Sequence, residues 1–394
     1  MTIDRVIPNP NSLEAAADPS FESQTVAIGS DRMVVNLGPQ HPSTHGVFRL
    51  VLTLEGETIV DAAPVMGYLH RGTEKIMEEG TYLQNVTLTD RLDYLAGMSN
   101  NLAYSLAVEH MAGIEVPLRG QYLRVLFMEL QRYASHCVAI GTFGADVGTF
   151  FTPLLYTFRE REAILDLFEF ACGARMTFTF IRPGGAALEL PDEFYPVCQR
   201  LLDTLPRQVD EYEALLTTNE IFVARTRNVG VLPAEKAIAY AVSGPVLRAS
   251  GVPYDLRRDV PYGAYPEFDF DVITRTEGDC YARYLVRIAE MRESIKICQQ
   301  ALKKVIETPG PSVTRLSLFY RPPPGEGFSR IEAPRGELGF YVVSDGGIAP
   351  YRSNCRPPSF INIGPLASML IGWKVADVIA ILGSIDIVLG EVDR

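Results

Sequence analysis

Cysteine is scarce in this sequence, and no two cysteines form a CxxC pair. The six of them are spread widely over 394 residues: Cys137, Cys172, Cys198, Cys280, Cys298 and Cys355. Disulfide frameworks, zinc ribbons and iron–sulfur sites use characteristic cysteine spacings. The spacing therefore argues against all three kinds of site in this chain, and it predicts reduced, buried thiols of a cytoplasmic protein.

Long apolar runs and an excess of positive charge are also missing. No stretch approaches the roughly 20 apolar residues of a membrane-spanning helix. Residues 1–20 lack the basic segment and apolar run of a secretory signal. The 48 acidic residues outnumber the 36 basic ones, for a net charge of −12, which disfavours binding to a nucleic-acid backbone. We therefore expect no nucleic-acid partner, and we expect any membrane association to come through other proteins.

Length and apolar content are sufficient for a large core. With 394 residues, 47% of them apolar, the chain can form two or three packed subdomains. The expected fold class is α+β, predominantly α. We expect four regions: a polar arm over 1–28, a small antiparallel β region over 29–71, a central helical bundle over 72–308, and a C-terminal region of β-hairpin and helix over 309–394 that completes the bundle.

Local patterns place the individual elements. β-Branched runs around a turn at 54–57 predict the N-terminal sheet. The run GELGFYVVS before a turn at 344–347 predicts the C-terminal hairpin, and 365–382 a closing helix. The helix over 278–306 is expected to place Arg287 off its apolar side. Helical spacing, caps and breakers predict helices from Thr73, from Thr89 or Asp90 to Gly113, over 123–138 with an end at Gly141, from Thr152, and over 192–218, 233–242 and 278–306.

Histidine is scarce too, yet two of the five histidines share one loop of the β region. The stretch NLGPQHPSTHG places His41 and His45 four residues apart. An HxxxH pair suits zinc when a helix carries both rings on one face. Pro42 and the nearby glycines break such a helix, so a metal site is the weakest interpretation. Two others stay open: a purely structural turn, and a rigid loop, ending at Gly46, that holds one imidazole for proton transfer.

Three further clusters carry charged or phenolic groups near the ends of expected helices. Arg91 and Tyr94 lie in TDRLDYLAG, Asp146 lies among small residues in GTFGADVG, and HRGTE holds Arg71 and Glu74. Each has an ordinary structural explanation as an ion pair, a solvated turn or a helix cap. A buried Asp146 beside a histidine would instead fix the tautomer of that histidine and favour its charged form. Taken residue by residue, these patterns name no reaction.

Eight segments, in one order, carry a family resemblance over nearly the whole chain. They are NLGPQHPSTHGVFRL, GYLHRGTEK, DRLDYL, TPLLYTFREREAILDLFE, SGPVLRASG, YLVRIAEMRESIKI, RGELGFYVVSDGG and LGSIDIVLGEVDR. Together they resemble the quinone-site large subunit of respiratory complex I. The resemblance is strongest for the cyanobacterial and chloroplast form, the corresponding subunit of the NAD(P)H–plastoquinone oxidoreductase complex. Ile387, where many bacterial relatives have proline, points to the same form.

The resemblance implies a fold like the large subunit of nickel–iron hydrogenases, a helical bundle flanked by small β regions. Hydrogenases hold their metal pair with two CxxC motifs, and this sequence has none. We therefore expect the chain to bind no metal and no iron–sulfur cluster. Arg71, Gly72 and Glu74 resemble a remnant of the hydrogenase site, as does Asp386, and the resemblance implies that the corresponding cavity holds a quinone.

By the same resemblance, His45 and Tyr94 hydrogen-bond the quinone carbonyls, and Asp146 is the carboxylate partner of His45. Reduction of a quinone by two electrons needs two protons, which a phenol and an imidazolium can deliver. His41 and Gly46 are expected to shape the quinone-pocket loop.

Electrons are implied to come from a 4Fe–4S cluster in a neighbouring subunit, close to an arginine that matches Arg91. A nearby guanidinium favours the reduced cluster and raises its potential. Relatives often carry a histidine where RMTFTFIRPGG has Thr177 and Phe178. The resemblance therefore does not extend to a cluster potential that depends on pH.

The implied function is that of a peripheral-arm subunit that forms the plastoquinone headgroup pocket of a proton-translocating NAD(P)H or ferredoxin–plastoquinone oxidoreductase. Its implied partners are the iron–sulfur-cluster subunit, other peripheral-arm subunits and a multi-span membrane subunit. The implied location is the cytoplasmic (stromal) side of the thylakoid membrane, and no activity is expected from the isolated chain. The alternative is a structural or assembly subunit of the same complex with a vestigial hydrogenase-like pocket.

Overall fold

A computed structural model describes residues 26–28, 32–40 and 46–394 of the chain. The arm expected over 1–28 lies almost wholly outside the described residues, and so do His41 and His45. The other predicted site residues lie within them.

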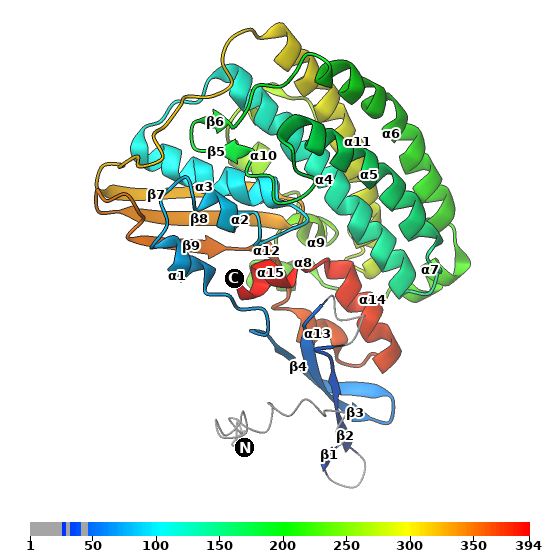
Figure 1. Cartoon of the computed structure of the whole chain (residues 1–394). Coiled ribbons are helices and arrows are strands. Elements are labelled where there is room, and N and C mark those ends of the chain that lie inside the picture. Colours follow the sequence, from blue (N-terminus) through cyan, green and yellow to red (C-terminus); the bar gives the residue numbers. More distant parts are fainter. Residues whose placement is uncertain (1–25, 29–31, 41–45) are drawn as a thin grey trace.

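The N-terminal β region is a four-stranded antiparallel sheet in the order β1 (Val26–Ile28), β2 (Arg32–Leu37), β3 (Arg49–Glu55) and β4 (Thr58–Val65). Alternate residues of β3, namely Leu50, Leu52 and Leu54, are buried, as expected of a strand with one face on a core. The predicted turn at 54–57 is confirmed as the β3–β4 connection. In Figure 1 this sheet extends away from the helical body of the molecule.

Four long helices form the predicted bundle: α4 (Leu118–Asp146), α5 (Thr152–Cys172), α6 (Phe194–Leu216) and α11 (Cys280–Glu307). They lie side by side in Figure 1, where α4 packs against both α5 and α11. The helix expected to end at Gly141 continues to Asp146. Only a glycine fits at position 141 of this helix, because α5 passes so closely that a Cβ here would lie 2.3 Å from Thr157 Oγ1.

Shorter helices and a two-stranded ribbon connect these elements. The ribbon is β5 (Ile181–Arg182) with β6 (Gly185–Ala186). The helices before the C-terminal sheet are α1 (Thr73–Met77), α2 (Val86–Thr89), α3 (Gly97–Ala112), α7 (Glu220–Thr226), α8 (Ala234–Ala239), α9 (Gly244–Arg248), α10 (Leu256–Asp259) and the 3₁₀ helix η3 (Tyr265–Glu267).

The segment around Tyr94 differs from its prediction. We expected a helix from Thr89 or Asp90, but α2 ends at Thr89 and α3 begins only at Gly97. The carboxylate of Asp93 accepts hydrogen bonds from the amides of Leu95 (3.0 Å) and Ala96 (3.2 Å). An aspartate bonded in this way offers the backbone an alternative to the helix. Tyr94 therefore lies in a turn between α2 and α3.

The C-terminal sheet is larger than the hairpin that we expected. GELGFYVVS forms β8 (Gly336–Ser344), which pairs with β9 (Arg352–Arg356) across the predicted turn and with β7 (Gly325–Ala333) on its other edge. α3 packs on β7 and β8. The chain then forms α12 (Pro358–Asn362), α13 (Leu366–Leu370), α14 (Val375–Ile385) and α15 (Leu389–Asp393). The predicted α+β class with a helical majority is confirmed.

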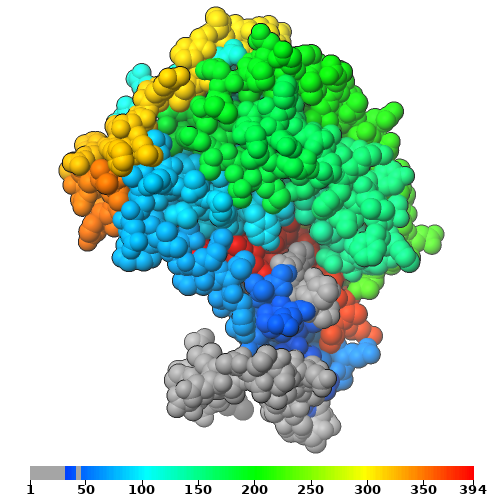
Figure 2. Space-filling model, viewed as in Figure 1, coloured from blue at the N-terminus to red at the C-terminus, as the bar shows by residue number. Residues whose placement is uncertain are grey.

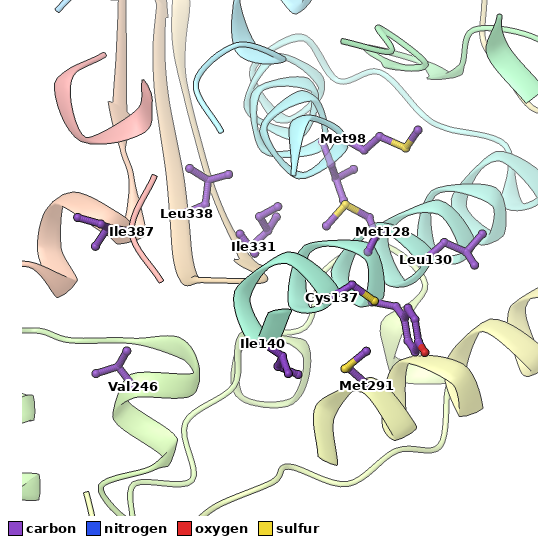
Figure 3. Packing of buried hydrophobic residues seen from close by; sticks show 14 of the residues in the cluster. Met98, Met128, Leu130, Cys137, Ile140, Val246, Met291, Ile331, Leu338 and Ile387 are labelled. Atoms are coloured by element: carbon purple, nitrogen blue, oxygen red, sulfur yellow. The ribbon is translucent and has the colours of Figure 1, made fainter. Parts of the chain in front are cut away.

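The main core joins the bundle to this sheet. Figure 3 shows Met98 of α3, several α4 side chains that include Met128 and Cys137, and Ile331 and Leu338 of β7 and β8. All of them are buried in one continuous cluster. Within the described residues, no helix is both long enough and apolar enough to cross a membrane.

Candidate functional site

The short helix α15 lies next to two parts of the predicted site, Gly46 and the turn that carries Tyr94. In Figure 1 it lies near the label of the C-terminus, and in Figure 2 red atoms of the C-terminal part show between the blue N-terminal residues and the green helices. The backbone of Gly390 in α15 lies against the turn that carries Tyr94. A Cβ at Gly390 would be 2.5 Å from the Leu92 carbonyl oxygen and 3.4 Å from Tyr94 Cε1.

The same helix lies close to Gly46, the predicted end of the loop that carries the two histidines. A Cβ at Gly46 would lie 3.6 Å from Leu389 Cδ1. Gly46 follows His45 directly in the sequence, and Leu389 precedes the glycine that touches Tyr94. The loop's end and the Tyr94 ring therefore lie against two consecutive residues of α15.

Tyr94 is neither fully exposed nor buried. Its exposed fraction is 38%. Burial raises the pKa of the phenol, and the positive charge of Arg335 partly opposes that shift. The phenol therefore keeps its proton at neutral pH and can donate it to a base, and the exposed part of the ring is open to a ligand or to a neighbouring subunit.

A buried arginine holds the Tyr94 turn from behind. Arg335, in the connection between β7 and β8, donates from Nη1 to Asp93 Oδ2 (2.7 Å) and to Ser135 Oγ (3.1 Å). From its other side it donates to the backbone oxygen of Asp386 (2.8 Å) and to Asp386 Oδ1 (3.1 Å). Arg335 was not predicted as a site residue, because the sequence around it indicated only the beginning of a strand.

Arg71, Glu74 and Asp386, which resemble a hydrogenase remnant, lie in three different surroundings. Arg71 Nη2 donates to the Arg91 carbonyl (2.6 Å) and to the Gly390 carbonyl (3.3 Å), so Arg71 belongs to the Tyr94 surroundings. Glu74 pairs instead with Arg352 of β9 (2.9 Å) and accepts from the Cys355 amide (3.0 Å). Asp386 belongs to the Arg335 cluster. The Arg91 side chain is exposed and donates to the Thr87 carbonyl.

Asp146 is the last residue of α4 and not a turn residue. Burial raises the pKa of its carboxyl to about 7. Its predicted partner, His45, lies outside the described residues, so the His45–Asp146 pairing stays a prediction.

Asp90 is a carboxylate near the candidate site. Its burial could not be predicted from the sequence. Its Oδ2 accepts from the Thr179 amide (2.9 Å). It thereby joins the Arg91 turn to the segment RMTFTFIRPGG, in which Thr177 and Thr179 have positive φ of 54° and 47°. Thr177 donates its hydroxyl to the Met176 carbonyl (2.7 Å).

A second buried charge network lies deeper in the bundle. Glu129 of α4 accepts from Arg132 (3.1 Å), Arg257 (3.2 Å), Tyr265 (2.7 Å) and Ser294 (2.8 Å). His136 Nε2 lies 2.9 Å from the Glu290 carboxylate, which also pairs with Arg248 (2.8 Å). The burial of these charged side chains could not be predicted from the local sequence, because a charged residue in a helical pattern normally indicates a solvated face.

Arg287 shows how that rule misleads in this chain. We expected it off the apolar side of its helix, yet it is 3% exposed and donates to the carbonyls of Ser384 (2.8 Å) and Ile385 (3.2 Å). These two residues precede Asp386, so Arg287 supports the Arg335 cluster from α11.

A cavity of about 440 Å³ lies elsewhere, between α3, the start of α4 and the loop at 262–265, beside the buried Arg124–Glu109 pair. None of the predicted site residues lines it. Over residues 26–28, 32–40 and 46–394, no three histidine, cysteine or acidic side chains are grouped as metal ligands.

Comparisons with known proteins agree on one family. The family model described as the respiratory-chain NADH dehydrogenase 49 kDa subunit matches residues 146–320 and 315–394. A relative from Dehalococcoides mccartyi, named as a subunit of NADH-quinone oxidoreductase, is 55% identical over 94% of this chain and its own full length. Relatives from Desulforamulus reducens (55% identical) and Roseiflexus (54%), named as the same kind of subunit, each match 93% of this chain over their full length. The chain therefore belongs to the family of the 49 kDa subunit of respiratory-chain NADH dehydrogenase, also called complex I.

Proposed function

We propose that this chain forms one wall of a quinone headgroup pocket in an NADH-quinone oxidoreductase, with Tyr94 and His45 as the proton donors. The observation that carries the proposal is the position of α15, whose residues Leu389 and Gly390 contact Gly46 and Tyr94 respectively. One short helix thus lies next to both segments to which the family resemblance assigns quinone contacts. The names of the relatives support the same reaction.

The chemistry of Tyr94 fits a donor that acts late. A quinone is a weak base, whereas the dianion left by two-electron reduction takes protons readily. A phenol whose pKa burial has raised keeps its proton until such a base forms. His45, as an imidazolium beside the Asp146 carboxylate, would supply the second proton. This chain's share of the reaction is therefore to orient the headgroup and protonate it.

The proposal includes partners, because we expect this chain to hold no iron–sulfur cluster of its own. A neighbouring subunit with a 4Fe–4S cluster would deliver electrons near Arg91. A multi-span membrane subunit would complete the quinone path and move protons. The partly exposed Tyr94 ring supports a pocket that closes only when another subunit covers it. On this proposal, charge changes at His45 and Asp146 bias the loops that contact the membrane subunit.

We further propose plastoquinone as the substrate and the stromal face of a thylakoid membrane as the location, with NAD(P)H or ferredoxin as the donor. The C-terminal segment GSIDIVLGEVDR with Ile387 supports this finer assignment. The bacterial relatives are named for a quinone of unspecified class. Turnover of the purified complex with plastoquinone, menaquinone and ubiquinone analogues tests it, and a preference for another class contradicts it.

The central test replaces the two donors in the assembled complex. We expect Tyr94→Phe and His45→Ala each to lower quinone reductase turnover by about 100-fold, because each removes one proton donor. The rate of electron transfer to an artificial acceptor that takes its electrons upstream of the quinone site should not change. Tyr351→Phe and His110→Ala are matched controls, since both residues are exposed and neither is a predicted site residue.

The outcome also distinguishes the proposed function from the structural alternative. If both donor variants assemble and reduce quinone at the normal rate, the pocket is vestigial and the chain is a scaffold. If the variants assemble but only quinone reduction fails, the catalytic assignment holds.

A further inference from the structure

Arg335 is buried between two segments that both reach Tyr94. It makes four hydrogen bonds, two from Nη1 to Asp93 Oδ2 (2.7 Å) and Ser135 Oγ (3.1 Å), and two from Nε and Nη2 to the backbone oxygen (2.8 Å) and Oδ1 (3.1 Å) of Asp386. A guanidinium is a planar, rigid fork, so it holds acceptors on its two sides at a fixed separation. Arg335 therefore ties the Asp93 turn to the segment around Asp386.

The contact with Asp93 fixes the backbone that carries Tyr94. Asp93 directly precedes Tyr94. Its Oδ1 accepts from the amides of Leu95 (3.0 Å) and Ala96 (3.2 Å), which follow Tyr94 in the chain. The carboxylate thus spans Tyr94, with Arg335 on one oxygen and the two amides on the other. A shift of the guanidinium would move the backbone on both sides of the phenol.

The contact with Asp386 fixes the approach to the helix that packs against the Tyr94 ring. Asp386 has a φ of 59° and lies between α14 and α15. Such a backbone conformation is uncommon for a residue with a side chain and persists where its surroundings hold it. Arg335 holds it by the backbone oxygen and the carboxylate together. In α15, a Cβ at Gly390 would lie 3.4 Å from Tyr94 Cε1.

The charge of Arg335 also acts on the phenol. Burial raises the pKa of Tyr94, and Arg335 opposes that rise, whereas Asp93 and Asp386 add to it. A cation that opposes the rise stabilises the phenolate that remains when Tyr94 has given up its proton. Arg335 thus combines two effects on one side chain: it fixes the place of the phenol, and it favours the charged form left by proton transfer.

We propose that Arg335 is the positioning residue for Tyr94: it holds the Asp93 turn and the approach to α15 in one arrangement, in which the phenol meets the bound quinone at a fixed geometry. This inference rests on the proposed function. Arg335 does not touch the quinone in this scheme, so its effect on the reaction passes through Tyr94. Positioning of this kind matters because a donor displaced by about 1 Å can lose about 100-fold in rate.

Arg335→Lys in the assembled complex tests the proposal. The ammonium keeps the positive charge, but it is a single point on a flexible stem and cannot hold both aspartates in one geometry. We expect kcat for quinone reduction to fall about tenfold, because a slightly displaced phenol still donates its proton, but less often. Arg330→Lys, at a partly exposed arginine of β7, is the matched control and should behave as the normal complex does.

The double variant of Arg335→Lys with Tyr94→Phe separates positioning from a general structural role. Once the phenol is gone, Arg335 has nothing left to position. We therefore expect the double variant to turn over as Tyr94→Phe does, about 100-fold below the normal rate. Two effects that multiply, to about 1000-fold, would overturn the inference, because Arg335 would then serve the pocket as a whole.

Asp93→Asn provides the same test if Arg335→Lys does not assemble. Its amide keeps an oxygen for the backbone of the turn but places a donor against the guanidinium. We expect kcat to fall about tenfold, with no further fall when Tyr94→Phe is present. A normal rate in Arg335→Lys, with a slow Tyr94→Phe variant, would overturn the inference and leave the proposed function standing. A normal rate in Tyr94→Phe overturns both.

Discussion

Single carboxylates in this chain have acidities set by their immediate partners. Burial raises the pKa of Asp90 to about 6, although the Thr179 amide opposes the shift. Burial would also raise the pKa of Glu129, but the guanidiniums of Arg132 and Arg257 hold it at about 2. The two groups therefore differ in what they do for stability: Glu129 favours the fold in its charged form, whereas Asp90 opposes the fold when charged.

Asp90 makes stability depend on pH in a defined direction. Its pKa is higher in the folded chain, at about 6, than its ordinary value of 3.8. The folded state thus binds the proton more tightly, and this contribution is full below about pH 4 and lost as the pH rises through 6. We expect Asp90→Asn to raise the free energy of unfolding by about 2 kcal/mol at pH 7 and to have little effect at pH 4.

Denaturant unfolding of the purified chain at several pH values between 4 and 7 measures this effect. Asp192→Asn, at an exposed aspartate, is the control and should leave the pH dependence unchanged. If Asp90→Asn shows the same slope against pH as the unchanged chain, Asp90 is not the titrating group.

Among the elements, α15 has an influence out of proportion to its five residues. It lies close to Gly46, it packs against the Tyr94 turn, and its Gly390 carbonyl accepts a hydrogen bond from Arg71. A helix this short has little stability of its own, so its place is set by packing on every side.

Gly390 is the point where this packing is closest. In Gly390→Ala the new Cβ would meet the Leu92 carbonyl oxygen at 2.5 Å, and backbone cannot move aside as a flexible side chain can. We expect α15 to shift from the Tyr94 turn and quinone turnover to fall at least tenfold, with KM for the quinone raised. Turnover assays on the assembled complex measure both.

A matched glycine provides the comparison. Gly325→Ala lies at the start of β7, and its Cβ would find its nearest neighbour, Met111 Cγ, at 4.0 Å. We expect normal turnover from that variant. Unchanged kinetics in Gly390→Ala would mean that α15 does not position Tyr94.

Across the whole molecule, the last residues fasten the entry to the helical bundle. The Asp393 carboxylate accepts from the amides of Gly67 (2.8 Å) and Leu69 (2.7 Å). The Arg394 carbonyl accepts from the amides of Arg71 and Thr73, both at 3.3 Å. Segments more than 300 residues apart in sequence therefore form one unit around HRGTE.

Removing the Asp393 carboxylate should loosen that unit. Hydrogen bonds to a charged acceptor contribute about 1.5–3 kcal/mol each. In Asp393→Ala we therefore expect amide hydrogen exchange over 67–73 to become roughly 10- to 100-fold faster. Mass spectrometry of the exchanged chain measures it, with Asp192→Ala as the control. Unaltered exchange over 67–73 would show that other contacts hold this segment.

Short-range patterns were enough for most of the elements. The β-branched runs around the turn at 54–57, the cap and proline at Thr152, and the apolar stripes of α4 and α11 predicted strands and helices close to those observed. Such signals act between residues a few positions apart, so they can be read along the chain. They were misleading where a side chain competed with the backbone, as Asp93 does before α3.

Packing settled the rest, because contact between distant segments has no local signal. Arg335 meets Asp93 across 242 residues of sequence, and Arg287 is buried although its helical position resembled a solvated one. Whether a charge is paired or exposed depends on which elements surround it, and that determines its pKa. The types of residue at the candidate site could thus be read from the sequence, whereas the Arg335 cluster and the position of Gly390 against Tyr94 emerged only when α3, the C-terminal sheet and α15 packed together.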